Sequence, residues 1–256
     1  MQKKIRWISL VAGCCSLFLL FAAMGDAPSE KLYTQLLEKY VHHDNVDYKN
    51  MRQDAAYERC IDAIESVDPD TISSANARLA FWINAYNAAT LDLICDKYPL
   101  KSIKDVDCGD GHKTAAWDKD FVVIHNKRMT LNDMENKVIR PNFKEPRIHF
   151  ALVCAAKSCP PLRTEAYRAD VLDGQLNDQA KTFLQDTSKN LFDTQHRVAH
   201  LSEVFDWYRN DFGGTDESVL RFISWYLPDA VGNDLRTTPA GWHIVYKSYD
   251  WSLNGY

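Results

Sequence analysis

Residues 73–99, with the sequence SSANARLAFWINAYNAATLDLICDKYP, decide the fold of this chain. Apolar side chains recur in this segment at the spacing of an α-helix, and they are Leu79, Trp82, Ile83, Tyr86, Leu91 and Ile94. A pair of serines at its start stands where a helix N-cap is expected, and the helix must stop before the proline at its end. Apolar residues cover so much of the segment that we expect the buried central helix of the domain.

Further segments with helical periodicity lie on both sides of this helix. They cover residues 32–41, 54–67, 172–184, 204–208 and 219–227. Another helix is expected after Thr130, because Thr130 and Asp133 have the spacing of a capping box. This number of helices indicates a chain that is mostly helical.

Extended segments are shorter and fewer. Residues 121–124 and 128–131 flank the dipeptide Asn126-Lys127 and predict a β-hairpin. The run Ile148–Val153 is almost entirely apolar and is bounded by prolines, which is typical of an interior strand. Two more strands are expected at 197–201 and 242–246. The whole pattern predicts an α+β fold, mostly helical, with a small central sheet and a β-hairpin.

The first 25 residues have the features of a signal peptide. Three basic residues among the first six precede an apolar run from Trp7 to Ala23. The run is shorter than the roughly 20 residues that a membrane-spanning helix needs, and polar sequence follows it at once. We therefore expect residues 26–256 to form a single mature domain that is periplasmic or secreted.

A lipid anchor is the alternative that this segment leaves open. The tetrapeptide Val11-Ala12-Gly13-Cys14 resembles the lipobox of bacterial lipoproteins. A lipidated Cys14 would hold the protein at the cell envelope, and contact with a membrane is expected only in that case.

Charge and cysteine content narrow the function classes. The net charge is −5 and no basic run is present, so the chain lacks the electrostatic footprint of a protein that binds nucleic acid. Removal of a signal peptide leaves an odd number of cysteines, namely Cys60, Cys95, Cys108, Cys154 and Cys159. In an oxidising compartment at least one thiol then lacks an intramolecular disulfide partner.

Four segments together resemble the family known as domain of unknown function 547. They are Val46-Asp47-Tyr48, the stretch from Phe81 to Asn87 (FWINAYN), the stretch from Arg147 to Leu162 that ends in SCPPL, and the closing YDWSLN at 249–254. The resemblance covers essentially the whole mature chain. It implies an exported bacterial member of a family whose eukaryotic members are joined to glutaredoxin, DEP or leucine-zipper segments, and it implies no assigned reaction.

A cysteine, a histidine and a carboxylate form the candidate catalytic set. Cys159 follows the predicted strand 148–153 in a loop, so it can reach His149, whereas Cys154 falls on the opposite face of a regular strand. His149 would activate the Cys159 thiolate, and Glu135 would orient His149. The set favours a thiol-dependent hydrolase or acyl transferase, papain-like or transglutaminase-like in style, that acts on an amide-type bond of a small-molecule or peptide substrate.

Polar residues near this set are candidate substrate contacts. Asn84 and Asn87 share one face of the central helix, and each can either donate into a cleft or hydrogen-bond backbone in adjacent loops. Ser158 is counted with them. No phosphate-cradling glycine loop, zincin helix or G-x-S-x-G elbow is present, so we expect neither a cofactor nor a metal.

Other accounts of the same residues remain open. Cys154 and Cys159 could form a disulfide, or with His149 they could bind zinc, although the spacing lacks the C-x-x-C form. Aromatic residues could build a carbohydrate or peptide platform or simply pack, and they are Trp207, Tyr208, Trp225, Tyr226, Trp242, Tyr249 and Trp251. The alternative function is a non-catalytic envelope binding or assembly domain.

Overall fold

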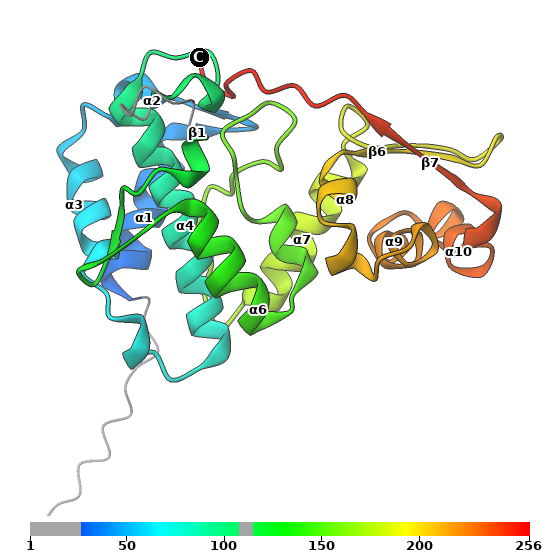
Figure 1. Ribbon diagram of the computed structural model, residues 1–256, viewed down its shortest axis with the longest axis horizontal. Coiled ribbons are helices and arrows are strands. Elements are labelled where there is room, and N and C mark those ends of the chain that lie inside the picture. Colours follow the sequence, from blue (N-terminus) through cyan, green and yellow to red (C-terminus); the bar gives the residue numbers. More distant parts are fainter. Residues whose placement is uncertain (1–26, 108–114) are drawn as a thin grey trace, which may run out of the picture.

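The computed structural model describes residues 27–107 and 115–256 (Figure 1). The predicted signal peptide, the lipobox with Cys14, and Cys108 lie outside the described residues. None of the described helices is both long enough and apolar enough to cross a membrane.

Helix α4 (Ala75–Lys97) lies at the centre of the helical half of the molecule. Ser74 caps it, because its side chain accepts a hydrogen bond from the backbone N–H of Ala77 at 3.2 Å. An unbroken run from Leu79 to Leu91 is buried, as expected for a helix with apolar residues on nearly all sides. The N-terminal helices α2 (Tyr48–Met51) and α3 (Ala55–Glu65) pack on it, and α1 (Pro28–Tyr40) packs on these two helices.

The predicted hairpin and the capped helix after it are confirmed, but the turn consists of His125 and Asn126, one residue earlier than the predicted Asn126-Lys127. Strand β3 (Val122–Ile124) pairs antiparallel with β4 (Lys127–Met129). Thr130 then forms a reciprocal capping box with Asp133 at the start of α5 (Leu131–Asp133). The helix continues as a π-helical turn over Met134–Ile139 and ends as α6 (Arg140–Phe143). A π-helical turn widens the backbone spiral and is frequent at functional sites.

The prediction of an interior strand over residues 148–153 is wrong. Residues Pro146–Phe150 form a 3-10 helix, and an irregular segment follows. The run is buried as predicted, but Asn87 on α4 replaces a neighbouring strand as hydrogen-bond partner. Its side chain binds the carbonyl of Ala151 and the N–H of Val153, both at 2.9 Å. Buried backbone N–H and C=O groups need hydrogen-bond partners, and the Asn87 side chain supplies them here in place of a neighbouring β-strand.

The C-terminal half contains the largest sheet among the described residues. Strand β6 (Val198–Ser202) pairs antiparallel with β5 (Leu191–Asp193) and parallel with β7 (His243–Lys247). Helices α8 (Val204–Trp207), α9 (Asp216–Ile223) and α10 (Asp229–Thr237) lie beside this sheet, and α7 (Leu172–Gln185) joins the two halves. A two-residue pair, β1 (Val41–His42) with β2 (Asn45–Val46), lies near the N-terminal helices.

Two hydrophobic clusters meet in one domain. Phe150 belongs to the C-terminal cluster, while its neighbours Ile148 and Ala151 belong to the N-terminal one, and Tyr249 packs against both. The α+β fold, mostly helical with small sheets and a hairpin, is thus confirmed. The sheet lies to one side (Figure 1), so its predicted central position is wrong, because residues 148–153 contribute no strand to it.

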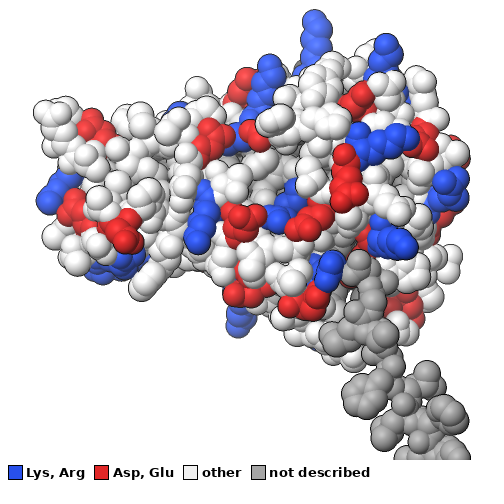
Figure 2. All heavy atoms as spheres, turned by 180° about the vertical axis from the view of Figure 1, so that it is seen from behind, with Lys and Arg blue, Asp and Glu red and all other residues white. Residues whose placement is uncertain are grey.

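The charged side chains are mixed by sign on the face turned away from the view of Figure 1. Figure 2 shows Lys and Arg side chains interspersed with Asp and Glu across this face, without a continuous patch of one sign. The mixture agrees with a net charge of −5 made from 30 basic and 35 acidic residues.

Candidate active site

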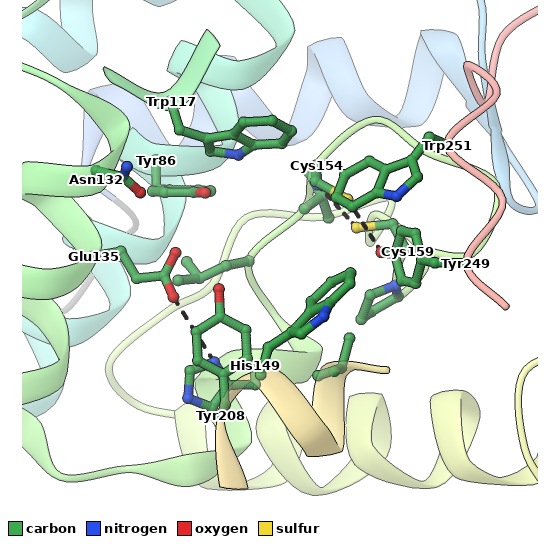
Figure 3. A pocket seen from close by; sticks show the side chains of 15 residues that line it. Tyr86, Trp117, Asn132, Glu135, His149, Cys154, Cys159, Tyr208, Tyr249 and Trp251 are labelled. Carbon is green, nitrogen blue, oxygen red and sulfur yellow. Dashed lines mark hydrogen bonds and ion pairs between the residues drawn. The ribbon is translucent and has the colours of Figure 1, made fainter. Parts of the chain in front are cut away.

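A pocket of about 700 Å³, counting the solvent at its mouth, lies where the two halves of the domain meet (Figure 3). Its walls are strongly aromatic, and its polar groups are few. Its lining includes Glu135, His149, Cys154, Cys159, Tyr208 and Tyr249. A concave, largely aromatic site with a few converging polar groups is the usual form of a small-molecule site.

Glu135 enters the pocket from the π-helical turn that packs on α4. Its side chain is buried, with the residue only 4% exposed. The Oε1 atom has no hydrogen-bond partner within the part of the chain that the structure describes. A buried carboxylate oxygen without a donor is costly, so it is an unusual feature in a folded protein.

His149 is held between two carboxylates. Its Nε2 lies 2.7 Å from Oδ2 of Asp211, so we assign the proton to Nε2 as the donor in this bond. Its Nδ1 lies 4.0 Å from Oε1 of Glu135, beyond hydrogen-bond reach. The ring of Tyr208 stacks on the imidazole with 3.8 Å between centroids. The imidazole is therefore fixed in orientation, and its second nitrogen faces the pocket carboxylate.

Asp211 is the anchor of this histidine. The hydrogen bond with His149, followed by those from the Arg140 guanidinium, holds the pKa of the Asp211 carboxyl well below its usual range. Arg140 binds both carboxylate oxygens, at 2.7 and 3.0 Å. Asp211 thus stays ionised and keeps the Nε2 tautomer of His149 in place.

The two cysteines of the loop that follows lie in contact without a disulfide. The Sγ of Cys159 accepts a hydrogen bond from the backbone N–H of Cys154 at 2.8 Å. The Sγ of Cys154 lies 3.2 Å from the hydroxyl of Tyr249. Cys154 is half-buried and Cys159 is buried, so the first of the two is the more accessible.

The two thiols differ in acidity. Burial, and after it the neighbouring Cys154, raises the pKa of the Cys159 thiol well above its usual value. Burial opposes ionisation of Cys154 as well, but hydrogen bonds from Cys159, from the Tyr249 hydroxyl and from backbone N–H groups outweigh it and lower the pKa of Cys154. The two opposite shifts favour Cys154 as the thiolate of the pair.

The C-terminal segment 249–254 holds this loop in shape. Ala155 has a left-handed backbone with φ of 57°, which is uncommon for a residue with a Cβ. Its carbonyl accepts a hydrogen bond from the N–H of Asn254 at 3.0 Å, and Ala156 pairs with Leu253 as an antiparallel bridge. The Ser158 hydroxyl accepts a hydrogen bond from the N–H of Asp250 at 2.9 Å. Strained backbone that is tied down in this way is frequent at functional sites.

Both asparagines of α4 bind backbone instead of facing the pocket. Asn84 donates to the carbonyl of Tyr167 and accepts from its N–H, both at 2.8 Å. Asn87 holds Ala151 and Val153 as described above. They are buried and hydrogen-bonded, as predicted, and their carboxamides position the chain on either side of the cysteine loop.

The predicted site residues are thus brought together in part. Glu135, His149 and Cys159 line one pocket, but no contact between His149 and Cys159 occurs among the described residues. Asn84, Asn87 and Ser158 are not among the residues that line it. Nor do three His, Cys, Asp or Glu side chains in residues 27–107 and 115–256 lie close enough together to hold a metal ion.

Sequence reasoning missed Cys154, Asp211 and the role of Tyr249. Cys154 was set aside only because a regular strand would have turned it away from His149, and that strand is absent. Asp211 lies 62 residues from His149 and stands in no motif, so the sequence held no signal for it.

The remaining walls of the pocket are aromatic rings that pack on one another. Trp207 stacks on Trp251 with 5.6 Å between centroids, and Tyr249 contacts both rings, at 4.8 and 4.6 Å. Trp117 meets Trp251 edge to face at 5.6 Å. Trp207, Tyr249 and Trp251 belong to the aromatic set that the sequence singles out as either platform or packing, and they pack on one another while lining the pocket.

Residues 69–184 match the family model described as "Protein of unknown function, DUF547". This chain is a DUF547 protein. The matched region contains Glu135, His149 and both cysteines of the loop, whereas Asp211 and Tyr249 lie beyond it. No curated protein and no solved structure matches the chain. The likeness of this DUF547 protein to papain or transglutaminase therefore remains a prediction.

Proposed function

We propose that this DUF547 protein is a thiol-dependent hydrolase or acyl transferase that acts on amide-type bonds. The observation that carries the proposal is the position of Cys154, a half-buried residue that lines the pocket with its Sγ 3.2 Å from the Tyr249 hydroxyl, and the lowered pKa of its thiol supports it. A thiolate is the reacting species of cysteine enzymes, and an accessible one beside acid–base groups is the usual form of such a site. The pocket also holds His149 and Glu135, which can move protons.

Cys154 replaces Cys159 as the proposed nucleophile. Cys159 is 4% exposed and its pKa is raised, so it is the poorer nucleophile of the two. Its protonated thiol instead donates to Cys154, and the Tyr249 hydroxyl adds a second donor. A thiolate with two such donors is stabilised without a direct contact to histidine.

The proposed reaction has two steps. The Cys154 thiolate attacks the carbonyl carbon of a bound amide, the C–N bond breaks, and a thioester forms on Cys154. The proton that leaves Cys154 is taken up at His149, which passes it to the departing nitrogen. Water or an amine then attacks the thioester, His149 takes the proton of that nucleophile, and the thiolate of Cys154 is restored.

An activated ester tests the proposal without knowledge of the natural substrate. With p-nitrophenyl acetate we expect a burst of nitrophenolate from acylation of Cys154, followed by slow turnover. Cys154→Ala abolishes the burst. His149→Ala retains it, because nitrophenolate leaves without a proton, but lowers the steady-state rate roughly 100-fold, because the attacking water loses its base.

Matched variants complete this test. Cys60→Ala and His196→Ala remove a buried cysteine and an exposed histidine away from the pocket, so both should behave like the unsubstituted protein. A burst that survives Cys154→Ala, or no burst at all in the unsubstituted protein, would contradict the enzyme proposal. The second of these results would favour the alternative, a non-catalytic envelope binding domain, which the stacked rings of Trp207, Tyr249 and Trp251 would suit.

We also propose that the protein is exported, on the basis of the basic and apolar character of residues 1–25. The mature chain should then begin near residues 24–28 and be periplasmic or secreted. N-terminal sequencing of protein recovered from cells measures this directly. A lipid-modified Cys14 at the mature N-terminus would instead place the protein on a membrane.

A further inference from the structure

One oxygen of the buried Glu135 carboxylate, Oε1, has no hydrogen-bond donor among the described residues. Figure 3 draws this carboxylate pointing into the pocket, with the two cysteines, Tyr249 and Trp251 across the cavity from it. Glu135 is 4% exposed and its Oε1 atom has no hydrogen bond within the described part of the chain. Since an unmet buried acceptor is costly, the geometry calls for a ligand that brings a hydrogen-bond donor.

The cationic groups near Glu135 give no hydrogen bond to its Oε1 atom. His149 uses Nε2 for Asp211, and its Nδ1 stays 4.0 Å from Oε1 of Glu135. Arg140 gives three N–H groups to Asp211 and to Asn136. Among the described residues that line the pocket, none is Lys or Arg. The negative charge at this end of the pocket is therefore open to a cation from outside.

The aromatic walls suit the same kind of ligand. The faces of aromatic rings attract cations, and ammonium groups in particular. Trp251 already makes a cation–π contact within this protein, because the ammonium of Lys104 lies 3.7 Å from the centroid of its ring. Tyr208 stays protonated beside Glu135, since burial and then the Glu135 charge raise its pKa, and its ring adds to the wall.

We propose that the Glu135 end of the pocket binds a primary ammonium group, which is the amine half of the amide-type substrate. The inference rests on the proposed function for its chemistry, but the binding itself does not depend on the thiol. A primary ammonium has three N–H donors for Oε1 of Glu135, whereas a quaternary ammonium has none. When the C–N bond breaks, the departing nitrogen takes a proton from His149 and becomes an amine, and a second proton from solvent makes it such an ammonium. In the reverse direction the ammonium loses a proton to solvent and attacks the thioester as an amine, and His149 takes up the proton that the nitrogen loses on attack.

A titration with simple amines tests the binding. We expect n-butylammonium to change the tryptophan fluorescence in a saturable way, because three of the lining residues are Trp117, Trp207 and Trp251. 1-Butanol, which has the same chain and no charge, and butyltrimethylammonium, which has no N–H donor, should each bind at least tenfold more weakly. Alaninamide serves as a second amine. Alaninamide resembles a peptide amino terminus and n-butylammonium resembles a lysine side chain, so the tighter binder of the two indicates which kind of amine the site prefers.

Two variants locate the site. Glu135→Gln should lower the affinity for n-butylammonium at least tenfold. Glu217→Gln, which removes an exposed carboxylate on α9, should change that affinity less than twofold. Cys154→Ala should bind the amine as the unsubstituted protein does. Saturable amine binding by an unsubstituted protein that gives no ester burst would remove the enzyme proposal and leave this one. Three results would overturn the inference: equal affinity for 1-butanol and n-butylammonium, an amine affinity that is unchanged in Glu135→Gln, or no saturable binding of either amine. The first of these is measured on the unsubstituted protein, so it does not depend on whether a variant folds.

Discussion

Single side chains in this DUF547 protein replace hydrogen bonds that regular secondary structure would otherwise supply. Asn84 and Asn87 each use both ends of the carboxamide on the backbone of a distant segment. Their spacing of three residues puts them on one face of α4, so one helix holds two loops. The sequence predicted that these amides would be buried, but it could not name their partners, which lie 64 to 83 residues away.

Replacement of Asn84 by leucine tests this role. The change orphans the N–H and carbonyl of Tyr167, so we expect the free energy of unfolding in urea to fall by about 1–3 kcal/mol. Asn76→Leu, at an exposed position of the same helix, should stay within about 0.5 kcal/mol of the unsubstituted protein. Equal stabilities of the two variants would contradict the assigned hydrogen bonds.

The hydroxyl of Tyr249 is predicted to tune the cysteine beside it. Tyr249→Phe removes one donor to the Cys154 sulfur, so the pKa of Cys154 should rise and its alkylation by iodoacetamide near neutral pH should slow several-fold. Tyr98→Phe removes a hydroxyl that binds Tyr256, away from the pocket, and should leave the rate unchanged. Mass spectrometry of the labelled peptide measures both rates, and equal rates would exclude the hydroxyl from the thiolate site.

At the scale of elements, the C-terminal segment and the cysteine loop form one unit. Residues 250–254 pair with residues 155–158, and Asn254 is held in turn by Val46 and by the Tyr48 hydroxyl. The four segments that resemble the family thus meet around one site, although they are spread over the whole chain. This convergence explains why a terminal segment carries a motif.

A change that weakens the attachment of the C-terminal segment should also increase the mobility of the cysteine loop. Asn254→Ala leaves the buried Tyr48 hydroxyl without its acceptor and should cost about 1–3 kcal/mol of unfolding free energy. Amide exchange at Lys157 and Ser158 should quicken, since both N–H groups bind the C-terminal segment. Ser252→Ala, an exposed change that keeps the backbone bonds, is the control. Unchanged exchange in Asn254→Ala would mean that the loop holds its shape alone.

Local signals predicted the helices well, and they failed where a distant residue decides the structure. Ser74 and Thr130 cap helices as their spacing indicated, because a cap acts on backbone within three residues. The run 148–153 is apolar in a strand and in a buried 3-10 helix alike, so periodicity could not separate them. That error hid Cys154, and with it the difference between the two thiols.

At the scale of the molecule, Asp211 links the two halves of the domain. It lies next to Phe212 of the C-terminal cluster, and it binds Arg140 and His149 from the first half. Its pKa is lowered in the folded state, so its contribution to stability is present above the unfolded value of about 4 and is lost as pH falls through the folded value.

This linkage predicts how stability depends on pH. Asp211→Asn should unfold at a lower temperature than the unsubstituted protein at pH 7, and the gap between the two melting temperatures should shrink as pH falls below about 4. Asp229→Asn, an exposed change on α10, should show a small gap that does not depend on pH in this way. A gap for Asp211→Asn that stays constant into acid would exclude the predicted linkage.

The central claim is that Cys154 is the reactive thiol of the pocket, and the pH dependence of alkylation at each cysteine tests it most directly. Native protein is treated with iodoacetamide from pH 5 to pH 9, quenched and digested, and the labelled fraction of each cysteine is read by mass spectrometry. Burial raises the pKa of Cys60 and Cys95 to about 12 and raises that of Cys159, so these three should react slowly at every pH. Cys154 should react fastest and keep its rate to a pH below the ordinary thiol value of about 8.5. Labelling of Cys159 ahead of Cys154, or a Cys154 rate that falls away already near pH 8.5 as an ordinary thiol would, contradicts the account.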